Sequence, residues 1–166
     1  MPSLYPVAGA KISIGPAVNS VPDDEDIDAT DFASVTWTEI KGWQTMGAIG
    51  DAATLITESV ISSGRDLKAK GTRNAGSMQN NFIILPADTG QIALIAAEKT
   101  DFNYPFRIEF DDAPPTGSAP KGTIKYFYGI VMTAQENGGG ANTARLISGN
   151  IEINSVIITV APTTGA

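Results

Sequence analysis

Alternation of apolar and polar residues is the feature of this sequence that most constrains its fold. In YPFRIEF at 104–110, the apolar Phe106, Ile108 and Phe110 alternate with charged residues. A period of two places alternate side chains on opposite faces of an extended chain, so this segment is predicted to be a half-buried β-strand. Similar alternation, or enrichment in β-branched and aromatic residues, predicts further strands at 11–14, 35–40, 124–133, 147–153 and 156–160.

One helix is predicted among these strands, at about 89–98. Asp88 and Gln91 have the spacing of a capping box, in which the Asp88 carboxylate accepts from the Gln91 backbone. The residues that follow, IALIAAEK, are good helix formers. Ile92, Ile95 and Ala96 are expected to share one face of this helix. The fold class is therefore mainly β: two packed antiparallel sheets, sandwich-like or barrel-like, with one flanking helix and long loops.

Three segments lack a periodic pattern and are predicted to be long loops: 19–31, 62–78 and 111–122. Long loops without secondary structure are uncommon in compact domains, and those that occur usually serve a function. The middle one holds four of the eleven basic residues of the chain, namely Arg65, Lys68, Lys70 and Arg73. Gly138, Gly139 and Gly140 are predicted to form the tip of a hairpin.

The first of these loops contains six carboxylates within 23–31, among them Asp23, Asp24, Asp26 and Asp28. Counted from Asp24 as a calcium-binding loop, position 6 is Ala29 and position 12 is Val35. The template needs Gly at the first of these positions and a bidentate Glu at the second. The run therefore fails as a calcium loop, and it is predicted to be a solvated, self-repelling connection between two strands.

The composition of the chain excludes most kinds of catalytic site. The chain has no Cys and no His, which excludes disulfides, thiolate metal sites and nucleophilic systems that use a histidine base. The P-loop-like segment 71–77 lacks the required Lys, and Glu109 and Asp111, two apart, have no predicted cleft beside them. We therefore expect neither an enzyme nor a bound cofactor or metal.

Charge and hydropathy limit the partners. A net charge of −7 argues against binding duplex DNA, because such binding needs clustered Lys and Arg. No apolar run reaches membrane-spanning length, and the N-terminus lacks the pattern of a secretory signal, so no membrane association is expected. One binding function remains open: a carbohydrate-binding or adhesion β-sandwich that uses Trp37 and Trp43, although Trp is more often a core or interface anchor.

The order of these segments resembles that of the major tail tube protein of long-tailed, non-contractile bacteriophages. The similarity extends over about 5–160, and it is carried by VTWTEIKGW at 35–43, KGTRNAGSM at 70–78, DTGQ at 88–91, YPFRIEF at 104–110 and YGIV at 128–131.

The resemblance implies two packed sheets and a helix in each subunit. It implies a hexameric ring whose inner sheets join into one barrel, and stacked rings that form the conduit for DNA ejection. The long loop Ser62 to Met78 would reach a neighbouring subunit or ring. Residues 1–166 would be a single tail-tube domain, without the C-terminal immunoglobulin-like domain that some members add.

The resemblance also implies partners and a location. The chain would bind copies of itself, the tail tip or baseplate, the tape measure protein and the tail terminator. It would be assembled in the host cytoplasm and reside in the virion tail. Genome DNA would pass through an acidic lumen without specific binding, since like charge repels the phosphates.

Finally, the acidic and basic loops are predicted to dock between copies. Asp23, Asp24, Asp26 and Asp28 of one copy would meet Arg65, Lys68, Lys70 and Arg73 of another. Complementary charges of this kind steer assembly and fix register. Because exposed charges are screened beyond about 10 Å at 0.1 M salt, assembly is expected to weaken as salt rises.

Overall fold

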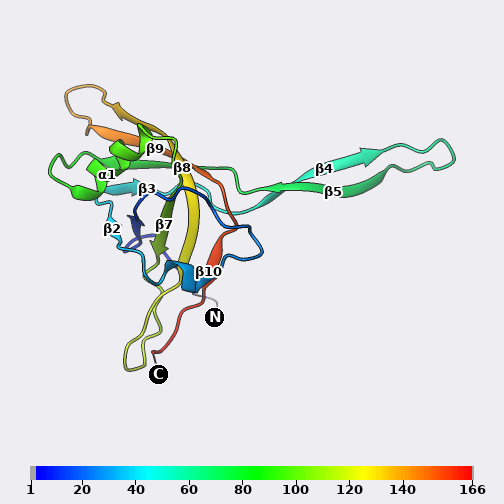
Figure 1. Ribbon diagram of the computed structural model, residues 1–166. Helices are drawn as coiled ribbons and strands as arrows, with labels where there is room; N and C mark the ends of the chain where they lie inside the picture. The colour runs from blue at the N-terminus through cyan, green and yellow to red at the C-terminus, as the bar shows by residue number, and fades with distance from the viewer. Residues whose placement is uncertain (1–2, 166) are drawn as a thin grey trace.

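The computed structural model describes residues 3–165, which form two antiparallel sheets and one α-helix (Figure 1). The larger sheet has eight strands in the order β2-β1-β7-β8-β9-β6-β3, with β10 also paired to β8. The smaller sheet is the pair β4-β5. The predicted mainly β class with one helix is confirmed. The strands of the larger sheet are β1 (Lys11–Ile14), β2 (Thr38–Glu39), β3 (Trp43–Thr45), β6 (Ser77–Ile83), β7 (Tyr104–Glu109), β8 (Ile124–Asn137), β9 (Leu146–Ile153) and β10 (Ile158–Val160).

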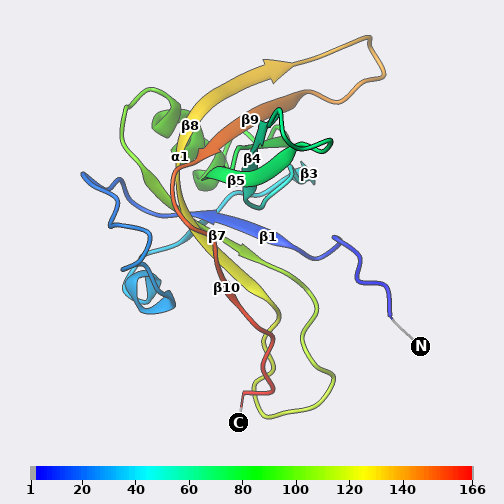
Figure 2. The ribbon, with the colours of Figure 1, turned by 90° about the vertical axis from the view of Figure 1, so that its right-hand side faces the viewer.

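Strand β8 organises the larger sheet because its 14 residues are long enough to serve several neighbours. Its first half pairs with β7 and β10, and its second half pairs with β9. A register shift between Val131 and Thr133 interrupts the β8–β9 ladder. Such bulges bend a strand and increase its twist, and Figure 2 shows β8 curving across the whole body.

The main core lies on one face of this sheet. Alternate residues of β1, β6, β7, β8 and β9 point into it, and those that are fully buried include Ile12, Phe82, Phe106, Phe127 and Ile151. Helix α1 (Thr89–Glu98) covers this face. The helix packs so closely against β2 that a Cβ atom at Gly90 would lie 2.0 Å from the Glu39 carbonyl oxygen. Glycine is therefore needed for this approach.

The helix begins and ends as predicted, and the Asp88 carboxylate accepts from the Gln91 backbone N–H at 2.9 Å. The face that carries Ile92, Ile95 and Ala96 is only partly buried, through Ile95, which packs against the main core. Ile92 is 55% exposed, whereas Leu94 and Ala97 are buried together with Gly90. These three residues lie at i, i+4 and i+7, which is the spacing of one face of a helix. Because the whole segment is apolar, the sequence does not indicate which face is buried.

A second apolar cluster covers the opposite face, where β7, β8 and β10 meet. Phe32 ends the short 3₁₀ helix η1 (Ala29–Phe32) and packs 4.8 Å from the Tyr126 ring and 6.4 Å from the Trp37 ring, measured between centroids. The predicted strand 35–40 is therefore only partly correct, since just Thr38–Glu39 pairs with β1. The segment before it turns to place Trp37 on the cluster instead.

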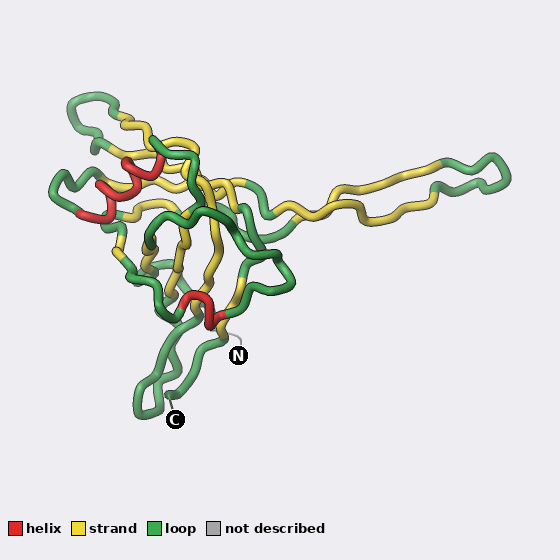
Figure 3. The backbone as a smooth tube through the Cα atoms, viewed as in Figure 1, coloured by secondary structure: helices red, strands yellow, loops and turns green. Residues whose placement is uncertain are grey.

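The prediction of a long loop at 62–78 is wrong. Strand β4 (Ala52–Glu58) pairs with β5 (Leu67–Asn74), and β6 begins at Ser77 (Figure 3). The hairpin tip at Gly138–Gly140 is confirmed, as it connects β8 to β9. The loop 111–122 is also confirmed, and Lys121 in it forms a backbone bridge with Thr163 near the C-terminus.

Candidate assembly surfaces

The most exposed part of the protein is the β4–β5 hairpin, which we call the arm (residues 52–74). Figure 1 shows that it extends far from the body. Every residue from 52 to 70 is exposed, including Leu55, Ile56 and Leu67, which are 64%, 46% and 61% exposed. At the turn, Val60 and Ile61 are exposed as well. Isolated two-stranded hairpins are marginally stable at best in water, and the arm has no third strand or helix packed on it to support it.

The two faces of the arm differ in chemistry. Cross-strand register places Lys70 opposite Leu55 and Lys68 opposite Thr57, so both lysines lie on one face. On the other face Ile56 lies opposite Ala69, and Glu58 opposite Leu67. The arm is thus a ribbon with one basic face and one largely apolar face.

The four predicted basic residues lie in different parts of this arm. Lys68 and Lys70 are on β5, and Arg65 is in the turn before it. Arg73 lies at the base of the arm, where its guanidinium pairs with Asp51 at 3.1 Å. Lys68 and Lys70, together with Arg65, are therefore the cations that the arm carries outward.

The acidic run has an internal structural role that the sequence did not indicate. Asp24 accepts a hydrogen bond from the Val156 N–H at 2.8 Å, and Asp28 caps η1 by accepting from the Thr30 N–H at 2.7 Å. The Thr30 hydroxyl and N–H hold the pKa of Asp28 below its ordinary value. This cap positions the helix that carries Phe32. Asp23 and Asp26 are exposed, as predicted for a solvated segment.

A hollow of about 790 Å³ lies where the acidic run meets the base of the arm. Its lining includes Asp24, Glu25 and Asp51, opposed by Arg73 alone. The hollow therefore has an excess of negative charge. Among the described residues, no ion pair joins the acidic run to Arg65, Lys68 or Lys70 of the same molecule.

The free face of β6, β8 and β9, opposite α1, is polar and nearly uncharged. Hydroxyl and amide groups bond across it, as in the bonds from Ser148 to Asn81 at 3.0 Å and from Asn137 to Ser148. By the strand registers, the polar residues on this face are Ser77, Gln79, Asn81, Thr133, Gln135, Asn137, Ser148, Asn150 and Glu152, and the apolar Ile83, Ile130 and Leu146 lie on the same face toward the strand ends. Glu152 is the one ionisable residue in this set, and it accepts from the Ser77 hydroxyl.

Both tryptophans are engaged within the protein. Trp43 packs against the main core, and its indole N–H donates to the Asn80 side chain at 3.1 Å. Trp37 stacks in the aromatic cluster, with the Arg107 guanidinium 5.0 Å from its ring centre. Neither is an exposed stacking platform of the kind that a sugar-binding site uses.

Residues 3–165 contain neither a cluster of metal-binding side chains nor a membrane-spanning helix. That span holds no group of three or more His, Cys, Asp or Glu residues arranged to bind a metal. In the same span, no helix has both the length and the apolar character needed to cross a membrane.

No protein family model matches the sequence, and no curated protein does. Solved structures do match. A chain of the anti-feeding prophage baseplate superposes with a TM-score of 0.68 and 10% identity, covering 97% of this chain and 98% of that one. The SPP1 tail tube protein gives a TM-score of 0.65 and 14% identity over 94% and 80% of the two chains.

A third match comes from the sheath/tube terminator of an extracellular contractile injection system, PVC. It gives a TM-score of 0.63 and 11% identity, over 96% of this chain and 99% of that one. These proteins belong to both phage tails and contractile particles. The chain therefore has the fold shared by tail tube and baseplate proteins.

Proposed function

We propose that this protein is a structural subunit that self-assembles into the tube of a phage tail or a related injection particle. The observation that carries the proposal is the arm. It presents apolar side chains and a basic face to solvent, with no support from its own body. Such an extension does not stabilise the fold of its own subunit. It can bind two subunits together if a second copy covers the arm.

We further propose closed hexameric rings that stack into a tube. The resemblance in sequence order supports this, as does the fold shared with the anti-feeding prophage baseplate, whose structure is six-fold symmetrised. Ring closure pairs or covers strand edges that would otherwise associate without limit. Residues 1–166 act in this proposal as one tail-tube domain. The other tail partners are the tape measure, the tail terminator and the tip or baseplate.

The nearly uncharged face of β6, β8 and β9 suits the wall of a DNA conduit. Amides and hydroxyls there offer no cation to hold a phosphate, so the genome would pass without specific binding. This differs from the acidic wall expected from the net charge, because the carboxylates of the chain are concentrated elsewhere. The proposal places the protein in the virion tail, after assembly in the host cytoplasm.

The acidic hollow is the proposed receiver for the basic face of another copy's arm. Lys68 and Lys70 would enter it beside Asp24 and Glu25. Each exposed pair contributes only about 0.2–1 kcal/mol, but repetition along a tube multiplies the effect. Changing both lysines to Glu should slow tube growth, and raising salt should do the same to the wild-type chain.

Electron microscopy of the concentrated chain tests the proposal. The matched variant replaces residues 54–72 with Asn-Gly, so that the paired residues Ala53 and Arg73 flank a two-residue turn. The wild-type chain should form rings or tubes, whereas the shortened variant should stay monomeric with an unchanged melting temperature. Wild-type protein that remains monomeric at high concentration, with and without a tail-tip nucleator, would refute self-assembly. Tubes formed by the shortened variant would refute the role of the arm.

A further inference from the structure

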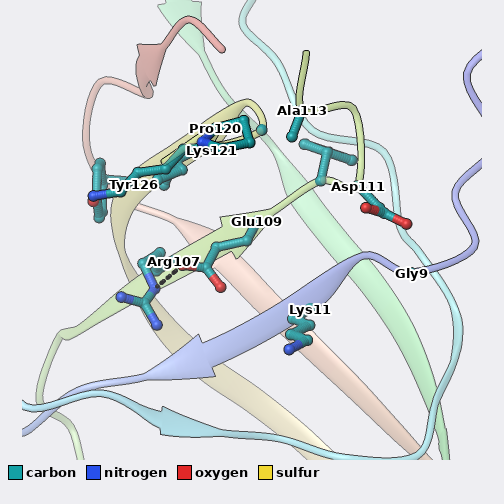
Figure 4. A pocket seen from close by; sticks show the side chains of 12 residues that line it. Gly9, Lys11, Arg107, Glu109, Asp111, Ala113, Pro120, Lys121 and Tyr126 are labelled. Carbon is teal, nitrogen blue, oxygen red and sulfur yellow. Dashed lines mark ion pairs between the residues drawn. The ribbon is translucent and has the colours of Figure 1, made fainter. Parts of the chain in front are cut away.

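A pocket of about 430 Å³ lies beside the loop 111–122, apart from the arm and the acidic hollow (Figure 4). Lys11, Arg107 and Lys121 line it together with Glu109 and Asp111. The pocket lining therefore carries three cations and two carboxylates, a small excess of positive charge, although the net charge of the chain is −7. Three of the seven basic residues outside 65–73 thus gather around one small pocket.

Arg107 is the centre of this arrangement. Its guanidinium is held against the Trp37 ring, at 5.0 Å from the ring centre, by a cation–π contact. Its Nε lies 3.4 Å from Glu109 Oε1, which is within ion-pair range, yet this buried Nε–H has no hydrogen-bond acceptor. Buried polar groups are normally satisfied, and this Nε–H beside the pocket is an exception.

The other two cations come from separate elements. Lys11 lies on β1, directly opposite Glu109 on β7, and Lys121 lies in the loop above them. The backbone of Lys121 is fixed by its bonds to Thr163, at 2.8 Å and 3.0 Å. Within 3–165, neither lysine forms an ion pair with a carboxylate. Figure 4 shows Lys11, Arg107 and Lys121 on separate segments among the residues that line the pocket.

We propose that this pocket binds an oxyanion, in the form of a carboxylate or phosphate group. Arg presents donors in a planar fork that matches such groups, and two lysines add charge around it. The anion can come from a neighbouring copy as an Asp or Glu side chain, or from solution as free phosphate. The first source rests on the proposed self-assembly, whereas the second does not.

Thermal unfolding of the isolated subunit tests the binding. Sodium phosphate replaces chloride at constant ionic strength, and the rise in melting temperature is compared between variants. Phosphate stabilises many proteins non-specifically, so the decisive quantity is the difference between variants. At about ten times the dissociation constant, the wild-type chain should gain roughly 3 °C more than Lys121→Gln or Arg107→Gln.

Lys121→Gln is the decisive variant, because Arg107 also packs on Trp37 and its replacement could weaken the fold. Arg145→Gln is the matched control, since Arg145 pairs with Glu136 at 2.8 Å and does not line the pocket. It should keep the full wild-type rise. An equal rise in the wild-type chain and Lys121→Gln, or no rise in the wild-type chain, would overturn the proposal.

Assembly kinetics then distinguish the two sources. If a neighbouring copy fills the pocket, phosphate at constant ionic strength slows wild-type tube growth, and Lys121→Gln grows slowly without phosphate. If a free anion fills it, neither change alters the growth rate. A chain that forms no tubes refutes the proposed function and leaves the unfolding test of this pocket valid.

Discussion

The body and the arm are built from similar strands but are stabilised in different ways. In the body, alternate residues such as Phe106 and Ile108 are fully buried against α1 and neighbouring strands. In the arm, Leu55, Ile56 and Leu67 remain largely exposed. The body buries its own hydrophobic surface, whereas the arm leaves its apolar side chains exposed, and we propose that another copy covers them. In our proposal, folding and assembly therefore depend on separate parts of one chain.

The largest contrast in unfolding free energy is expected between two leucine truncations, one in the body and one in the arm. Leu94→Ala, at a side chain with no exposure, should lower the free energy of unfolding by about 2–5 kcal/mol. Leu67→Ala, on the arm, should change it by no more than about 0.5 kcal/mol. Chemical denaturation of the isolated subunit measures both. Equal losses would show that the arm contributes to the fold of the subunit.

A smaller contrast is expected between two glycines. Gly90→Ala places a Cβ atom against the Glu39 carbonyl and should cost about 1–3 kcal/mol as the helix is pushed away from β2. Gly64→Ala, in the arm turn with no atom within 4 Å, is the matched control. The control should leave the melting temperature of the subunit nearly unchanged. A tolerated alanine at Gly90 would mean that the helix does not sit this close to β2.

The smallest effect concerns the carboxylates that order the body's loops. Hydrogen bonds from the Thr123 hydroxyl and N–H hold the pKa of Asp112 below its ordinary value of 3.8. A folded pKa below the unfolded one gives stability that is present above pH 3.8 and is lost as pH falls through the folded pKa. Denaturation between pH 6 and pH 2 should therefore show a flatter decline for Asp112→Asn.

Thr123→Val provides the companion variant. It removes the hydroxyl donor and keeps the backbone N–H, so it should reduce the pH dependence less than Asp112→Asn does. If both variants follow the wild-type curve, these hydrogen bonds do not set the acid stability of the loop.

Much of the body could be predicted from sequence because burial leaves a pattern. The alternation in 104–110 and the cap at Asp88 led to β7 and α1 with nearly correct bounds. The arm left no such pattern, since both of its faces are exposed and glycine and charged residues interrupt it. The sequence therefore predicts a loop at 62–78, which contains the second strand of the arm, and it indicates the basic character of that segment but no strand at 52–58.

The pocket around Arg107 was missed for a related reason. Lys11, Arg107 and Lys121 are far apart in the sequence, and only the pairing of β1 with β7 and the return of loop 111–122 bring them together. Similarly, the bond from Val156 to Asp24 joins residues 132 positions apart. Local patterns carry no information about such long-range contacts.

Hydrogen exchange on both states of the protein tests the central claim most directly. In the isolated subunit, amides of β4 and β5 should exchange far faster than those of β7 and β9, because no tertiary contact protects the arm. In assembled tubes, the arm amides should become strongly protected while those of β7 and β9 change little. Arm amides that are equally protected in both states, or equally unprotected, would contradict the claim that a second copy holds the arm.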